Sequence, residues 1–111
     1  MSYCLFLDDV REPPYPVFGP WTVARTMAEA QEIVLARGCP YYMSLDHDLG
    51  SVDGVVQPTG YDFAKWFIEQ DMDGKISIPK DDEDFIYNSH SANPVGMMNI
   101  MKLLESYLAK R

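Results

Sequence analysis

The chain has 111 residues, 47% of them apolar, and a formal net charge of −8. This length suits one domain spanning residues 1–111, and the acidic balance argues against duplex DNA binding, which requires Lys and Arg to neutralise phosphates. No apolar run reaches the roughly 18 residues of a membrane-spanning helix. The N-terminus also carries no basic flank or cleavage site, so we expect a cytoplasmic protein without a membrane segment.

The first predicted element is a buried strand over the apolar run 5–7, which ends abruptly at Asp8 and Asp9. The prolines that follow argue against a helix between residues 12 and 20. Residues 21–24 are predicted to form a short strand at the edge of the sheet, whose direction the sequence leaves open.

A helix is predicted to begin after Thr26, which opens a capping-box sequence, and to end at Gly38. The apolar run 41–45 is the next predicted strand, and it is again followed by acids, in residues 46–48. A polar, glycine-rich loop is expected from there to residue 58.

Thr59 is predicted to cap a second helix. Residues 71–84 are expected to form a loop that can accommodate a minor strand at residues 76–78. Residues 85–88 are the last predicted strand, and Pro94 suits the first position of a final helix after an asparagine cap. That helix is expected to bury a stripe made by Met97, Met101, Leu104 and Leu108.

Strands that alternate with helices indicate an α/β fold with a mostly parallel sheet. In such sheets ligands bind beyond the carboxyl ends of the strands, where the strand order switches. The polar clusters of this sequence follow the predicted strands, so we expect the functional site at that edge of the sheet.

Two pairs of acids, Asp8 with Asp9 and Asp46 with Asp48, follow two separate apolar strands. Carboxylates held close together repel, so either some become protonated or a cation binds between them. Oxygen ligands suit Mg²⁺ or Mn²⁺, and we therefore predict a divalent-metal site made by these four residues. The alternative is that the acids cap helices or face solvent.

The two histidines of the chain, His47 and His90, both follow predicted strands. An acid and a base that titrate near neutral pH suit the cleavage of a phosphoester. Both histidines are therefore candidate catalytic residues. Which histidine acts as acid and which as base is left open.

Ser91 and Asn93 are predicted to lie at the start of the final helix. Free N–H groups and the helix dipole favour a phosphate oxygen at that position, although simple helix capping explains both residues equally well. Arg11 is either a phosphate contact or a member of a surface ion pair.

Four segments carry a resemblance to a known family. In chain order they are LFLDDVREPP at 5–14, SLDHDLG at 44–50, TGYD at 59–62 and HSANPVG at 90–96. Together they resemble the cyclic-phosphate-processing receiver-like domains, relatives of response-regulator receivers. The resemblance implies a receiver-like (flavodoxin-like) three-layer sandwich with a truncated, mostly parallel sheet. It also implies a Mg²⁺-type pocket and a role in processing nucleotide cyclic phosphates.

By analogy with receivers, the resemblance assigns Asp8 and Asp9 to metal binding, Asp46 to phosphate acceptance and Ser89 to the hydroxyl position after the next strand. The chain also departs from the receiver pattern. No strand-end lysine follows the third helix, prolines replace the first receiver helix, and two histidines are added. These departures favour hydrolysis over signalling.

The favoured hypothesis is a metal-dependent phosphoesterase that acts on a small nucleotide or an RNA end carrying a cyclic phosphate, for example a 2′,3′-cyclic phosphate. In this hypothesis the aspartates bind the metal, His47 and His90 act as acid and base, and the phosphate is held by Arg11, Ser89, Ser91 and Asn93. The alternative is a non-catalytic or phospho-accepting receiver-like module that binds a partner or a nucleotide.

Overall fold

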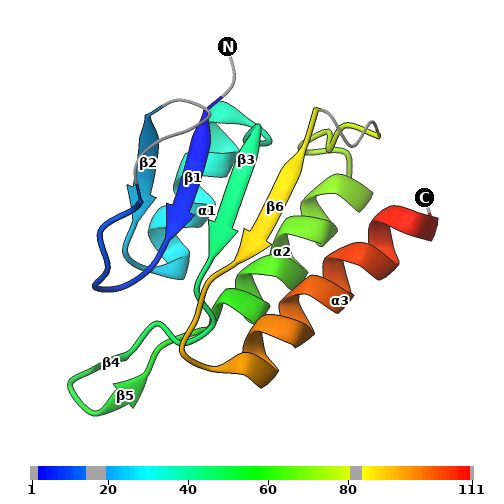
Figure 1. Cartoon of the computed structure of the whole chain (residues 1–111). Helices are drawn as coiled ribbons and strands as arrows, with labels where there is room; N and C mark the ends of the chain where they lie inside the picture. Colours follow the sequence, from blue (N-terminus) through cyan, green and yellow to red (C-terminus); the bar gives the residue numbers. More distant parts are fainter. Residues whose placement is uncertain (1–2, 15–19, 81–83, 111) are drawn as a thin grey trace.

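The computed structural model describes residues 3–14, 20–80 and 84–110. The main sheet has four parallel strands in the order β2-β1-β3-β6 (Figure 1). The strands are β1 (Cys4–Leu7), β2 (Trp21–Ala24), β3 (Tyr42–Leu45) and β6 (Ile86–Ser89). Because β2 lies on one side of β1 while β3 and β6 lie on the other, the strand order switches at the carboxyl ends of β1 and β3.

Three helices cover one face of this sheet: α1 (Met27–Arg37), α2 (Gly60–Met72) and α3 (Pro94–Lys110), with α2 packed between the other two (Figure 1). Side chains alternate between the two faces of a strand, and the leucines of β1 and β3 join the helices in one buried cluster.

The opposite face of the sheet, which we call the helix-free face, carries Phe6, Trp21 and Tyr42. The α/β class and the receiver-like, mostly parallel sheet are as predicted. The predicted third layer is not found among the described residues. The reason is that residues 11–14 and 20 of the proline-containing β1–β2 connection are not helical, while residues 15–19 lie outside the described part.

Local sequence signals account for the helix ends. The Thr26 side chain accepts a hydrogen bond from the backbone N–H of Glu29 at 3.1 Å, and α1 ends at Gly38, whose φ of 84° is in the left-handed region. Thr59 and Asp62 form a complete capping box at the start of α2. Both helices therefore begin where their caps predict, and α1 also ends at the predicted glycine, whereas α2 runs to Met72, two residues into the predicted loop 71–84.

Two connections differ from the predicted loops. The segment after β3 contains an antiparallel hairpin, β4 (Ser51–Val52) and β5 (Val55–Val56), because Asp53 and Gly54 adopt the positive φ that a tight hairpin turn requires. Residues 76–78 form no strand, and their two isoleucines are buried as loop residues.

The buried stripe of α3 is broader than the single row that was predicted. Ile100 and Leu104 are fully buried, whereas Met97 and Met101 are half-buried. This helix contacts both α2 and β6, so more than one row of side chains faces protein. Neither α3 nor any other described helix combines the length and apolarity needed to cross a membrane.

Candidate functional site

The residues that follow β1, β3 and β6 are held side by side by continued backbone pairing. The backbone N–H groups of Asp8, Asp46 and His90 each donate to the carbonyl of the last residue of a neighbouring strand, at 2.9–3.1 Å. Three polar residues far apart in the sequence are therefore fixed next to the switch in strand order.

Three carboxylates meet at this edge of the sheet. One oxygen from each of Asp8, Asp9 and Asp46, which we call the acid group, lies within 4.8 Å of the other two. Two oxygens bound to one Mg²⁺ at about 2.1 Å lie at most about 4.2 Å apart, so small side-chain rotations let the acid group hold that ion. Asp48 was predicted as a fourth ligand, but it lies outside the acid group.

Asp8 is the most strongly held member of the acid group, and its side chain is fully buried. Its Oδ1 accepts hydrogen bonds from the N–H groups of Val10 at 3.0 Å and Arg11 at 2.9 Å, and its Oδ2 lies 3.0 Å from Nε2 of His90. Burial by itself raises the pKa of Asp8, but the hydrogen bonds from Arg11, Val10 and His90 outweigh it and hold the pKa below its usual value. A carboxylate offers about four lone-pair sites, so one remains for a metal.

Asp9 is placed by the loop that follows β3. Gly50 in this loop has a φ of 75°, and a Cβ there would lie 2.7 Å from Oδ2 of Asp9. The left-handed backbone conformation therefore favours glycine at position 50, and a larger residue there would displace the carboxylate end of Asp9.

Asp46 is in a less favourable environment than Asp8. Burial raises the pKa of Asp46 and the charge of Asp8 adds to the effect, although a hydrogen bond from the Ser91 side chain opposes it. Without a cation, Asp46 therefore holds its proton to higher pH than an ordinary aspartate. A divalent ion would reverse this local charge balance.

His90 is held between Asp8 and Ser44 of β3. Its Nδ1 lies 2.6 Å from Oγ of Ser44, and its ring stacks on Phe6 with the centroids 4.4 Å apart and the planes 7° apart. Since the Asp8 carboxylate can only accept, Nε2 of His90 donates to it, and in the neutral ring Nδ1 accepts the hydroxyl proton of Ser44. The arrangement is an acid–imidazole–hydroxyl chain.

His47 lies against the first turn of α3. A Cβ at Gly96 would lie 2.4 Å from Cγ of His47, so the helix approaches this closely only because position 96 is glycine. Nδ1 of His47 lies 2.9 Å from Oδ1 of Asp48, and its Nε2 makes no hydrogen bond within the described residues. Asp48, whose side chain is 62% exposed, thus contacts His47 and not the acid group.

Helix capping explains one of the two residues predicted to bind phosphate at the start of α3. Oδ1 of Asn93 accepts the N–H of Gly96 at 3.0 Å, so Asn93 caps α3. Oγ of Ser91 accepts the N–H of Asn93 at 3.1 Å, and the Ser91 side chain is hydrogen-bonded to Asp46. Ser91 therefore connects the helix cap to the acid group.

Ser89 and Arg11 differ in their access to the site. Ser89 is buried and its hydroxyl donates to the carbonyl of Leu45 at 2.9 Å, so its proton is used within the sheet. Arg11 is half-exposed, with Nε 4.0 Å from Oδ2 of Asp8. Its backbone is fixed by Arg25, which was not predicted and whose Nη1 donates to the carbonyls of Asp8 at 3.2 Å and Arg11 at 2.5 Å.

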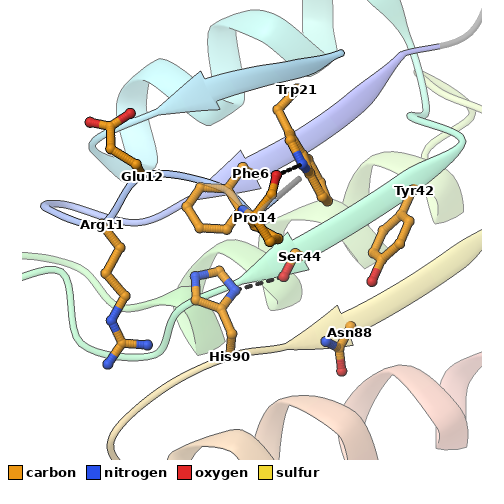
Figure 2. A pocket seen from close by; sticks show the side chains of 9 residues that line it. All are labelled: Phe6, Arg11, Glu12, Pro14, Trp21, Tyr42, Ser44, Asn88 and His90. Atoms are coloured by element: carbon orange, nitrogen blue, oxygen red, sulfur yellow. Dashed lines mark hydrogen bonds between the residues drawn. The ribbon is translucent and has the colours of Figure 1, made fainter. Parts of the chain in front are cut away.

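A pocket of about 270 Å³ opens beside His90 on the helix-free face (Figure 2). The connection after β1 contributes Arg11, Glu12 and Pro14, and the strands and their ends contribute Phe6, Trp21, Tyr42, Ser44, Asn88 and His90. Most of these residues were missed by sequence reasoning. The available signal was a serine inside the apolar run 41–45, but the faces of a strand cannot be assigned without its neighbours.

The sequence model of a protein family, described as the cyclic-phosphate processing receiver domain, matches residues 3–106 of the chain. The chain belongs to this family. The acid group of this receiver domain, at the carboxyl ends of β1 and β3, is typical of a receiver site and could hold a metal ion. No significant match is found among curated proteins or among solved structures.

The metal-free receiver domain should show opposite pH effects from two of its acids. Asp8, with a lowered pKa, stabilises the fold above the unfolded value of 3.8, and this stability is lost as the pH falls through the lowered pKa. Asp46, with a raised pKa, lowers the stability as the pH rises from 3.8 through the raised value. In EDTA, the Asp46→Asn variant should therefore become more stable relative to the wild type as the pH rises from 3 to 7.

Urea denaturation at several pH values measures this difference. Asp73→Asn, at the exposed C-terminal cap of α2, is the matched control and should show no such trend. A constant difference between Asp46→Asn and the wild type over this range would contradict the assigned environment of Asp46.

Proposed function

We propose that this receiver domain is a metal-dependent phosphoesterase that opens nucleotide cyclic phosphates, such as 2′,3′-cyclic phosphates. The observation that carries the proposal is the 3.0 Å contact between Nε2 of His90 and Oδ2 of Asp8. It joins a proton-transferring side chain to the acid group. A phospho-accepting aspartate does not need such a neighbour, whereas hydrolysis does.

The acid group would hold Mg²⁺ or Mn²⁺ through one oxygen each of Asp8, Asp9 and Asp46. When bound, the ion supplies positive charge that neutralises phosphate oxygens. The acids themselves are suited to this role because all their donors are oxygens and because His90 orients Asp8 by a hydrogen bond. Asp48 is no longer proposed as a direct ligand.

His90 is the proposed general base. Its Nε2 is committed to Asp8, so the proton that it accepts must arrive at Nδ1, where Ser44 lies at 2.6 Å. The hydroxyl of Ser44 can pass its proton to Nδ1 while taking one from a water that lies between Ser44 and the phosphate. The negative Asp8 carboxylate stabilises the imidazolium that results.

His47 is the proposed general acid. Its Nδ1 donates to Asp48, so it is the imidazolium form, with a proton on both nitrogens, that can give a proton from Nε2. In the reaction, water adds to phosphorus and loses a proton toward His90, the bond from phosphorus to one ribose oxygen breaks, and that oxygen takes a proton from His47. Arg11 and Ser91 are proposed to hold the phosphate.

The test is turnover of 2′,3′-cyclic and 3′,5′-cyclic nucleotides in Mg²⁺, in Mn²⁺ and in EDTA, with product identified by ³¹P NMR. We expect a linear monophosphate only with the metal, and a loss of at least about 100-fold in Asp9→Asn, as for loss of a group that tunes a metal site. Asp73→Asn, purified identically, should keep full turnover, whereas turnover that persists in Asp9→Asn would expose a contaminating phosphatase. Metal-independent product, or none across the panel, would overturn the proposal.

A second candidate function is phosphorylation of Asp46 as in a signalling receiver. It is favoured by the position of Asp46, which directly follows β3 and lies within the acid group. Against it, no lysine of the described residues forms an ion pair with the acid group. Treatment with acetyl phosphate tests it: a labile acyl phosphate that is lost in Asp46→Asn but kept in His90→Ala would support signalling.

A further inference from the structure

The pocket beside His90 has a preformed aromatic wall that phosphate chemistry does not require. The ring of Trp21 stands edge-on to Phe6 at 5.5 Å and to Tyr42 at 5.1 Å. Its Nε1 donates to the carbonyl of Pro14 at 3.1 Å, which fixes the indole. Aromatic walls of this kind bind planar rings by stacking or edge contacts.

A polar group lies at the same pocket. The side chain of Asn88, on the last strand, is exposed, and its amide makes no hydrogen bond within the described residues. Figure 2 shows this amide beside Ser44 and Tyr42 at the pocket. An amide presents a donor and an acceptor together, which matches the edge of a nucleobase.

The pocket and the acid group are separated by one imidazole ring. His90 contacts Asp8 through Nε2 and Ser44, a pocket residue, through Nδ1. Arg11 also belongs to both, because it lines the pocket and lies 4.0 Å from Asp8. A ligand with an anionic group at the acid group and a planar ring in the pocket would therefore pass over His90.

We propose that this pocket binds the base of a single nucleotide whose phosphate lies at the acid group. This inference rests on the proposed function and names the part of the substrate that the pocket recognises. Phe6, Trp21 and Tyr42 contact the faces or edges of the base, and Asn88 pairs with its polar edge. The volume of about 270 Å³ is slightly below the roughly 300–1,000 Å³ of pockets for drug-sized ligands. It suits one base, not a run of stacked bases.

The first experiment measures binding of a nucleoside without phosphate or metal. In a Trp66→Phe background the remaining tryptophan is Trp21, because the chain has two, and Trp66 packs against Phe63 on α2. Adenosine and cytidine in EDTA should change the fluorescence of Trp21 saturably. Asn88→Ala should weaken this binding about tenfold, as for the loss of a base contact. Asn99→Ala, exposed on α3, is the matched control and should not weaken it.

The second experiment compares hydrolysis of a nucleoside 2′,3′-cyclic phosphate with that of glycerol 1,2-cyclic phosphate, which has no base. We expect Asn88→Ala to raise KM for the nucleotide about tenfold with kcat retained, and to leave both constants for the glycerol compound unchanged. Absence of nucleoside binding, or equal binding by Asn88→Ala, overturns the base pocket. Nucleoside binding without turnover of either compound overturns the proposed function and leaves the pocket standing.

Discussion

Replacing Gly60 by alanine is expected to lower the free energy of unfolding by about 3 kcal/mol, the upper range for forcing extra atoms into a packed interior. A Cβ at Gly60 would lie 1.8 Å from the backbone oxygen of Asp46 and 3.3 Å from Cδ1 of Ile100. The first atom is backbone and cannot rotate away. Helix α2 must therefore shift, which also strains the 2.8 Å hydrogen bond from the N–H of Gly60 to the carbonyl of His47.

Gly54→Ala separates this steric effect from backbone strain. Gly54 has a φ of 80°, but a Cβ there would meet nothing within 4 Å. Its replacement should cost about 1 kcal/mol, the strain of a left-handed conformation alone. Urea denaturation of both variants measures the two costs. If Gly60→Ala were no less stable than Gly54→Ala, the close approach of α2 to Asp46 would be wrong.

The second large effect is expected for Asp8→Asn, which should reduce metal-dependent turnover on the order of 10³-fold or more by reversing a histidine tautomer. The new amide would present a donor to Nε2 of His90, so Nε2 becomes the acceptor and the ring proton moves to Nδ1. Nδ1 then donates to Ser44 and can no longer accept its proton. One oxygen that could bind a metal ion is lost from the acid group as well.

Nitrogen chemical shifts of His90 in ¹⁵N-labelled protein report the tautomer independently of activity. We expect the protonated nitrogen of neutral His90 to be Nε2 in the wild type and Nδ1 in Asp8→Asn. Asp73→Asn should change neither the tautomer nor kcat/KM. An unchanged tautomer in Asp8→Asn, or turnover within tenfold of the wild type, would contradict the role assigned to the Asp8–His90–Ser44 chain.

The elements of this fold are largely readable from local sequence. Apolar runs that stop at acids predict β1 and β3, and capping residues such as Thr26 and Thr59 predict the helix starts, because these signals act over a few residues. The hairpin of β4 and β5 was missed because its strands have only two residues each. That is too short to show the alternation of apolar and polar residues by which a strand is recognised.

The candidate site was predictable only in part. Residues directly after parallel strands must meet at one edge, so the sequence could place Asp8, Asp46 and His90 together. The same rule also grouped Asp48 with them, since residue order does not say which way a side chain points. In the structure the Asp48 side chain contacts His47 and not the acid group. His47 in turn lies against Gly96 of α3.

The sequence by itself determined the α/β class, the family resemblance and the candidate acids and histidines of the site, because each depends on residue type and local spacing. Only the tertiary structure decided that the helices cover one face and that His90 links Asp8 to Ser44. It also decided that Trp21, Tyr42 and Asn88 share a pocket. These features depend on four strands that pair in one sheet. The sequence of a single strand does not determine which of its two faces other elements cover.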